Sequence, residues 1–126
     1  MKTIKQSYQI NAKPEKVFEA LTNIKLIEEW SGASAKMENK KGGEFSLWNG
    51  DIFGKNLEIV KNKKLVQEWS YEGWKKSSKV TFTLKSAGKG TVVELLHEDV
   101  PDASAKSIAD GWDQYYLGQI KNMFKK

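Results

Sequence analysis

The residue best suited to chemistry in this sequence is His97, its only histidine. Because the chain has no second histidine and no cysteine, neither another imidazole nor a thiolate can share a metal ion with it. His97 falls near the end of a strand expected over residues 91–98, where it would face the interior opposite Ser78. It would serve there either as a polar anchor inside a cavity or as a hydrogen-bonded core residue, and we favour the core interpretation.

No acid, nucleophile and base occur at a spacing that indicates a catalytic site. The following glutamates are expected on solvated outer faces rather than in an acidic patch: Glu28, Glu29, Glu58, Glu68 and Glu94. We therefore predict that the protein is not an enzyme and that it uses neither a metal ion nor a cofactor.

The aromatic residues offer a second kind of chemistry, the binding of an apolar ligand. Large rings that face one another across a curved sheet and a helix either pack as a core or leave a void, and an apolar void with a few polar groups is how small ligands are held. Gln67, Ser78, His97 and the tyrosine hydroxyls are the candidate polar groups. The residues expected to line such a cavity are Phe45, Leu57, Gln67, Trp69, Ser78, Phe82, Val93, Leu95, His97, Trp112, Tyr115, Tyr116 and Ile120.

Two further tryptophans lie outside this set. Trp48 is next to an expected hairpin tip and Trp74 is in an expected loop. Exposed tryptophans at such places are typical anchors for a protein partner. Each of the two side chains could equally fold back onto the sheet.

Composition and charge narrow the possible partners. All 21 basic residues are lysine, and the net charge is +5. The absence of arginine argues against nucleic acid, because the planar guanidinium is the usual group for bidentate contacts with phosphate and guanine. A solvated surface is the favoured interpretation of the scattered lysines, with a functional basic patch as the alternative. Nothing at the amino terminus reads as a signal peptide, and no apolar run approaches the ~20 residues that a membrane span needs, so we expect one cytoplasmic domain.

These candidate residues must be positioned by a long helix at the end of the chain, expected over residues 103–126. The residues that fall on one side of it are Ile108, Trp112, Tyr115, Tyr116, Ile120 and Met123, and the apolar arc covers roughly 200° of its circumference. A helix that is apolar over more than half of its surface must be surrounded. Only the strands that precede this helix in the sequence can surround it.

The first part of the chain predicts one strand and two short helices. Residues 4–10 alternate between the two faces of a strand. Asn11 is expected to cap a first helix, whose first turn contains Pro14. Asn23 is expected to cap a second helix over residues 24–30.

From residue 33 the chain reads as antiparallel hairpins. Asn49 and Gly50 form a strong type I′ turn signal, which would pair Leu47 with Ile52. Leu57 is expected to face inward as well and to pair with Gln67. Ile52 and Leu57 are an odd number of residues apart, so a regular strand would place them on opposite faces. One extra residue must therefore be absorbed between them, and a bulge at Gly54 is expected.

The last two strands are expected over residues 78–84 and 91–98. Their expected register pairs residues of a single inner face, namely Leu84 with Thr91, Phe82 with Val93, Val80 with Leu95 and Ser78 with His97. Strands followed by one long helix predict an α+β fold, with a curved antiparallel sheet around the helix.

This order of elements resembles the helix-grip fold of START-like and birch-pollen-allergen-like domains. Within that superfamily, the segment GGEFSLWNGDI at residues 42–52 is similar to the glycine-glycine hairpin of proteins that activate the heat-shock protein 90 ATPase. The segment VQEW at residues 66–69, followed by Trp74, is similar to that family's tryptophan-bearing strand and loop. The closing helix, with Trp112 and Tyr116, also resembles theirs.

The resemblance covers the whole chain and implies two hypotheses of different classes. The first is a non-enzymatic, monomeric domain that holds a hydrophobic small molecule or lipid between the sheet and the closing helix. The second is a co-chaperone-like protein that contacts a heat-shock protein 90 relative through its surface. The resemblance is to the carboxy-terminal domain of the activators, and the amino-terminal domain that contacts the chaperone has no counterpart in this sequence. Lys75 also stands where the family usually has proline, in a shortened loop.

Overall fold

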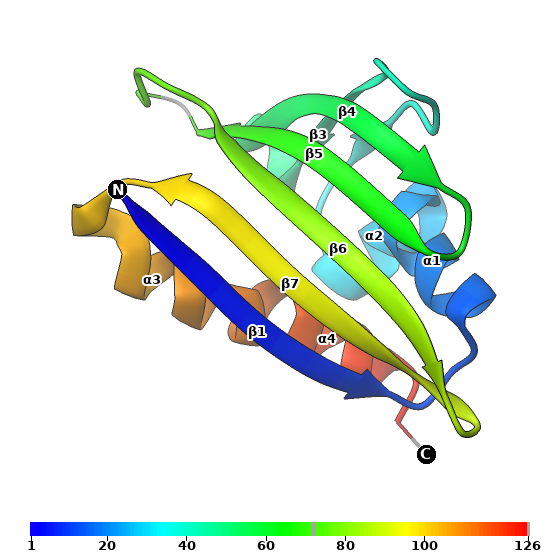
Figure 1. Ribbon diagram of the computed structural model, residues 1–126. Helices are drawn as coiled ribbons and strands as arrows, with labels where there is room; N and C mark the ends of the chain where they lie inside the picture. Colours follow the sequence, from blue (N-terminus) through cyan, green and yellow to red (C-terminus); the bar gives the residue numbers. More distant parts are fainter. Residues whose placement is uncertain (72, 126) are drawn as a thin grey trace.

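The computed structural model describes residues 1–71 and 73–125, and in it a curved sheet wraps around a long C-terminal helix (Figure 1). Its antiparallel strands lie in the order β1-β7-β6-β5-β4-β3-β2. The strands are β1 (Lys2–Ile10), β2 (Lys36–Met37), β3 (Glu44–Leu47), β4 (Ile52–Val60), β5 (Lys64–Tyr71), β6 (Ser78–Ala87) and β7 (Gly90–Val100). This arrangement confirms the predicted α+β helix-grip fold.

Two short helices follow β1, and both pack on the same side of the sheet as the closing helix. They are α1 (Pro14–Thr22) and α2 (Ile24–Ser31). Asn23 caps α2 as predicted, since its side-chain oxygen accepts a hydrogen bond from the Leu26 N–H at 3.2 Å. Asn11 does not cap α1. After β1 the backbone turns, with the Ala12 N–H donating to the Ile10 carbonyl, so the helix starts only at Pro14, which has no N–H to satisfy.

The closing helix is not uniformly α-helical. It consists of a 3₁₀ turn (Asp102–Ser104), α3 (Ala105–Gly111), a π-helical turn (Trp112–Tyr116) and α4 (Leu117–Met123). In the π turn the Leu117 N–H donates to the carbonyl of Trp112, five residues earlier. The wider turn places Trp112, Tyr116 and Leu117 together on the buried face. It leaves Tyr115 61% exposed, so the expectation that Tyr115 belongs to the buried arc is wrong.

The hairpin between β3 and β4 has its predicted register, with Leu47 paired to Ile52. Both central residues of the turn, Asn49 and Gly50, have positive φ, as a type I′ turn requires. The predicted bulge at Gly54 is wrong. Gly54 pairs regularly on both sides, and its role is a close approach, because a Cβ added there would lie 1.7 Å from the Glu68 carbonyl oxygen.

The extra residue in β4 is absorbed at Leu57 instead, where the pairing with β5 shifts. Asn56, and not Leu57, pairs with Gln67 and faces the interior. The polar residue takes the inner position because its side-chain oxygen accepts a hydrogen bond from the Gln67 amide at 2.9 Å. Leu57 is 40% exposed, so the prediction that it lines an interior cavity is wrong.

The predicted register of β6 and β7 is also wrong, by two residues. The structure pairs Leu84 with Val93 and Phe82 with Leu95, because the strands continue into a tight turn that pairs Ala87 with Gly90. A shift of two residues keeps every side chain on its expected face. The inner surface is therefore composed as predicted although the partners differ.

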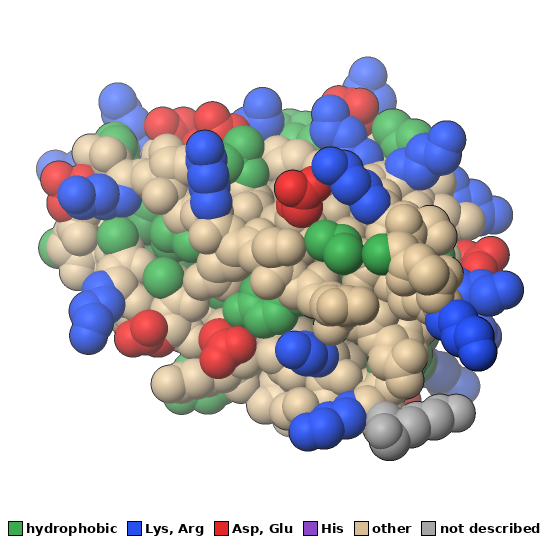
Figure 2. Space-filling view, turned by 60° about the horizontal axis from the view of Figure 1, so that its bottom comes forward, with side chains coloured by type: hydrophobic (Ala, Val, Ile, Leu, Met, Phe, Trp, Pro, Cys, Tyr) green, Lys and Arg blue, Asp and Glu red, His purple; other side chains and the backbone are tan. Residues whose placement is uncertain are grey.

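The outer surface is charged, and Figure 2 shows lysines spread over the displayed face with acidic residues between them, rather than one basic patch. No helix among residues 1–71 and 73–125 is both long and apolar enough to span a membrane.

Candidate ligand-binding cleft

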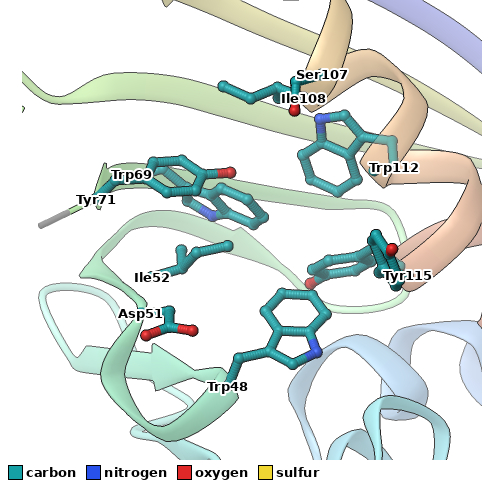
Figure 3. Close-up of a pocket in the computed structure, with 11 residues that line it drawn as sticks. Trp48, Asp51, Ile52, Trp69, Tyr71, Ser107, Ile108, Trp112 and Tyr115 are labelled. Carbon is teal, nitrogen blue, oxygen red and sulfur yellow. The ribbon is translucent and has the colours of Figure 1, made fainter. Parts of the chain in front are cut away.

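An open cleft of about 590 Å³ lies between the β3–β4 hairpin tip, the end of β5 and the closing helix (Figure 3). Six of its lining side chains are aromatic, two are aliphatic and only one is charged. The lining residues are Trp48, Asp51, Ile52, Trp69, Tyr71, Ser107, Ile108, Gly111, Trp112, Tyr115 and Tyr116.

The sheet side of the cleft is formed by Trp69 and Tyr71, which alternate with an outer residue on β5 and so point to the same face. The Trp69 N–H donates to the Gln67 side-chain oxygen at 2.8 Å, which fixes the indole orientation. Tyr71 is partly covered by Trp74, whose ring centroid lies 4.4 Å away. Burial raises the pKa of Tyr71 to about 12, so its hydroxyl stays protonated at neutral pH.

The helix side of the cleft is formed by α3 and the π turn. The Trp112 indole stacks on that of Trp69, with centroids 4.7 Å apart and planes at 26°. Tyr115 lies at the open rim, and Ser107 and Ile108 contribute from one turn earlier. The π turn therefore places three aromatic side chains, Trp112, Tyr115 and Tyr116, along one wall.

The third side is the hairpin tip, where Trp48 has a positive φ of 49°. Its ring packs edge-on against Trp30 of α2 at 6.1 Å and against Tyr116 at 5.9 Å. Asp51 is exposed and supplies the only charged side chain among the described lining residues.

On the helix side of the cleft, the Tyr116 side chain carries a polar group without a hydrogen-bond partner. Its side chain is 2% exposed, and its hydroxyl is the buried side-chain polar atom that lacks a hydrogen-bond partner within residues 1–71 and 73–125. Burial raises the pKa of the hydroxyl well above its ordinary value of 10, so the group remains a neutral donor.

His97 lies deeper, beneath Trp112, and is fully buried. The Trp112 N–H donates to His97 Nδ1 at 3.1 Å, so Nδ1 carries no proton and Nε2 does. Nε2 then donates to the Ser78 hydroxyl at 2.8 Å, and that hydroxyl donates to the Trp69 carbonyl. Burial lowers the pKa of His97 from its ordinary value of 6.5 to about 4. These contacts make His97 a hydrogen-bonded core residue.

A second set of polar contacts extends from Trp69 toward the far edge of the sheet. Gln67 accepts from Trp69 and donates to Asn56, and Asn56 donates to the Glu38 carbonyl at 2.7 Å. The partners of Gln67, Ser78 and His97 are thus groups of the protein itself, and none of the three lines the cleft. Their predicted role as polar anchors for a ligand is replaced by a structural one.

The residues predicted to line a ligand site divide into three groups. Four of them line the cleft: Trp69, Trp112, Tyr115 and Tyr116. Leu57 lies on the outer surface, and the others are buried in the core away from the cleft: Phe45, Gln67, Ser78, Phe82, Val93, Leu95, His97 and Ile120.

The two tryptophans predicted as partner contacts are both partly buried. Trp48 lines the cleft and Trp74 packs on Tyr71. Sequence reasoning did not include Tyr71, Ile108 or Ile52 in the site. Tyr71 shares a strand face with Trp69 and Ile108 a helix face with Trp112, which was the available signal, whereas Ile52 shares its strand face with no predicted residue.

The described residues do not bring together three His, Asp or Glu side chains that could hold a metal ion. The cleft itself offers aromatic surfaces, a neutral hydroxyl donor and one carboxylate at the rim. This arrangement suits non-covalent binding.

The curved sheet, the closing helix and the cleft between them define a helix-grip domain. The sequence matches the family described as "Activator of Hsp90 ATPase homolog 1-like protein" over residues 11–125, and the chain belongs to that family. The resemblance inferred from the hairpin, the tryptophan strand and the closing helix is therefore confirmed.

Similar proteins agree with this assignment. An activator of 90 kDa heat shock protein ATPase homolog from Dictyostelium discoideum is 31% identical over 98% of this chain and 33% of its own length. Homolog 1 from Homo sapiens is 27% identical over 97% of this chain and 36% of its own length. The chain thus spans about a third of these curated relatives. The crystal structure of an HSP90 activator from Plasmodium falciparum has a TM-score of 0.90 at 28% identity, covering 96% of this chain and 94% of that one.

Proposed function

We propose that this chain is a non-enzymatic binding domain, monomeric and cytoplasmic, that holds a hydrophobic small molecule or lipid in the aromatic cleft. The single observation that carries this proposal is the cleft of about 590 Å³, whose walls are mainly aromatic and open to solvent. Its size falls within the range of roughly 300–1,000 Å³ found for small-molecule sites.

The physical support is the aromatic surface that faces solvent at this place. It comes from Tyr115 and from the partly buried Trp48 and Tyr71, since Trp69, Trp112 and Tyr116 are each only 2% exposed. Removing apolar surface from water contributes about 25 cal/mol per Å², so a ligand that covers these rings gains affinity from them. The walls are held in position by the stacking of Trp69 on Trp112 and by the packing of Trp48 on Trp30. A preformed site loses little conformational entropy on binding.

The test is a native mass spectrum of freshly purified protein, which reports a retained ligand and the oligomeric state together. A two-dimensional NMR titration with the extracted compound should then shift the indole N–H signals of Trp48 and Trp112. A protein that carries no small molecule, and whose indole signals remain unchanged when apolar compounds are added, would contradict the proposal.

Contact with a chaperone of the heat-shock protein 90 class is the second candidate. Family membership favours it, as does the Plasmodium falciparum activator, whose solved chain is matched over nearly its full length. The tryptophan signals separate the two candidates. A ligand in the cleft perturbs Trp48 and Trp112, whereas a chaperone bound at the loop after β5 perturbs Trp74 first.

We expect this 126-residue chain by itself to stimulate a chaperone ATPase weakly or not at all, because it spans about a third of the curated activators. The measurement is the ATPase rate of the same organism's chaperone with and without micromolar protein. Strong stimulation would overturn this expectation and establish the second candidate.

A further inference from the structure

The unpaired hydroxyl of Tyr116 provides information about the ligand beyond its apolar character. A buried hydroxyl without a partner is unfavourable, and native structures satisfy most such groups. The Tyr116 ring is held by contacts with Trp30, Trp112 and Phe82, at centroid distances of 4.6, 4.7 and 5.7 Å. The ring cannot easily turn away, and its hydroxyl is shielded from solvent, so a bound molecule that shifts the side chains over the hydroxyl and offers an acceptor would satisfy it.

The charge of the cleft restricts the nature of that acceptor. Asp51 is the one charged side chain among the described lining residues, and it is negative. A carboxylate ligand would be repelled by Asp51 and would lose its hydration beside Tyr116 without a cationic partner. A neutral acceptor, such as a carbonyl or ether oxygen, avoids both costs.

The shape of the walls restricts the body of the ligand. Among the described lining residues six side chains are aromatic and two, Ile52 and Ile108, are aliphatic. Tyr115 is exposed and Trp48 and Tyr71 are partly exposed, so these three rings present surface to the cleft. Aromatic rings gain from stacking and edge contacts with other rings beyond the burial of area alone. A flat ring system uses these surfaces, whereas a flexible acyl chain loses rotamer freedom and gains no stacking.

We propose that the cleft selects a neutral, flat aromatic molecule whose oxygen accepts a hydrogen bond from the Tyr116 hydroxyl, in preference to a fatty acid. This inference rests on the proposed function, since it describes the occupant of the same cleft.

The test compares three probes on the intact chain: 2-acetylnaphthalene, 2-ethylnaphthalene, which has the same shape without the acceptor, and laurate below its micelle concentration. Binding is followed by NMR through the indole N–H signals of Trp48 and Trp112. We expect 2-acetylnaphthalene to bind at least fivefold more tightly than either of the other probes. In Tyr116→Phe the two naphthalenes should bind within twofold of each other. Tyr8→Phe, which removes a hydroxyl that donates to Gln6 outside the cleft, should keep the fivefold difference.

Other results overturn the inference in distinguishable ways. If both naphthalenes bind equally to the wild-type protein, or if Tyr116→Phe keeps their difference, the hydrogen bond is refuted while the cleft remains a ligand site. If laurate binds more tightly than 2-acetylnaphthalene, the selection for flat aromatic molecules is refuted. If none of the three probes shifts the indole signals, this inference and the proposed function both fail.

Discussion

At the scale of single residues, the interior is organised by directional hydrogen bonds between aromatic and polar side chains. Trp112, His97 and Ser78 form a chain in which every proton has an assigned position, because an indole N–H can only donate. A histidine held in this way must remain neutral, since a proton on Nδ1 would face the Trp112 N–H. This requirement has a measurable consequence for stability.

We expect the unfolding free energy to fall as the pH is lowered from about 6.5 to about 4. In this interval the unfolded chain binds a proton at His97, whereas the folded chain, with the pKa of His97 lowered to about 4, does not. The stabilising contribution is complete above pH 6.5 and is lost as the pH falls through 4. Its size is on the order of 3 kcal/mol. Urea denaturation at a series of pH values measures it.

The control is His97→Asn, whose amide oxygen can still accept from Trp112 but does not titrate. This variant should be less stable at neutral pH and should show a shallower dependence on pH between 4 and 6.5. Identical pH dependence in the two proteins would mean that His97 is not the group responsible.

Tyr116→Phe should leave the unfolding free energy unchanged or raise it by up to about 1 kcal/mol. The variant keeps the packed ring and removes a buried hydroxyl that has no partner. The matched control is Tyr8→Phe, because the Tyr8 hydroxyl donates to the Gln6 side-chain oxygen at 2.8 Å. Its removal should cost about 0.5–1.5 kcal/mol. Thermal melts compare the two, and a clear loss of stability in Tyr116→Phe would show that its hydroxyl has a partner in solution.

At the scale of elements, the π turn is the feature that shapes the cleft. It needs a close backbone approach at Gly118, where an added Cβ would lie 1.7 Å from the Asp113 carbonyl oxygen. The carbonyl of Gln114 within the turn accepts a hydrogen bond from the Gln119 side chain at 2.8 Å. π turns inside α-helices are often found at functional sites.

Gly118→Ala should therefore destabilise the protein by about 1–3 kcal/mol, as overpacking in a fixed backbone does. Gly111→Ala is the matched control seven residues before, with helical φ and a nearest contact of 3.8 Å to the Tyr115 ring. It should stabilise the protein by about 0.4–1 kcal/mol, because it restricts the unfolded chain. Circular dichroism melts give both values. Equal effects of the two substitutions would show that the π turn can readily relax.

At the scale of the whole molecule, Trp112 joins the sheet to the closing helix. Its ring contacts Trp69 at 4.7 Å and Phe82 at 5.6 Å, and its N–H is bonded to His97. These contacts come from three different strands of the sheet. A single side chain therefore couples elements that are distant in sequence.

Trp112→Ala should unfold the protein or leave it marginally stable. Truncating a buried tryptophan costs about 3–5 kcal/mol, and domains of this size hold only about 5–15 kcal/mol in total. Trp74→Ala is the control, since Trp74 is only partly buried and packs on Tyr71 at the edge of the cleft. It should cause a smaller loss. A Trp112→Ala protein that melts like the wild type would mean that the sheet does not hold the closing helix.

The general architecture could be predicted from the sequence because its signals are local. Alternation of apolar residues defines the strands, Asn49 and Gly50 define a hairpin turn, and the aromatic face around Trp112 requires a surrounding sheet. The family resemblance likewise depends on short segments. Of the four predicted residues that line the cleft, Trp69, Trp112 and Tyr116 were found because their strand and helix faces were correctly assigned, whereas Tyr115 lines it from the exposed rim and not from the buried arc.

The tertiary structure decided the features in which several residues compete for one position. Asn56 displaced Leu57 from the interior because only Asn56 could bond to Gln67, and this pairing is not visible in the periodicity of β4. The polar atoms of Gln67 are bonded to Asn56 and Trp69, and those of Ser78 and His97 to each other, to Trp69 and to Trp112. The buried side-chain polar atom left unpaired within residues 1–71 and 73–125 is the Tyr116 hydroxyl. Which polar groups stay without a hydrogen-bond partner depends on distances across the whole fold. The location of the cleft depends on them too, because it forms where the π turn, the hairpin tip and β5 meet.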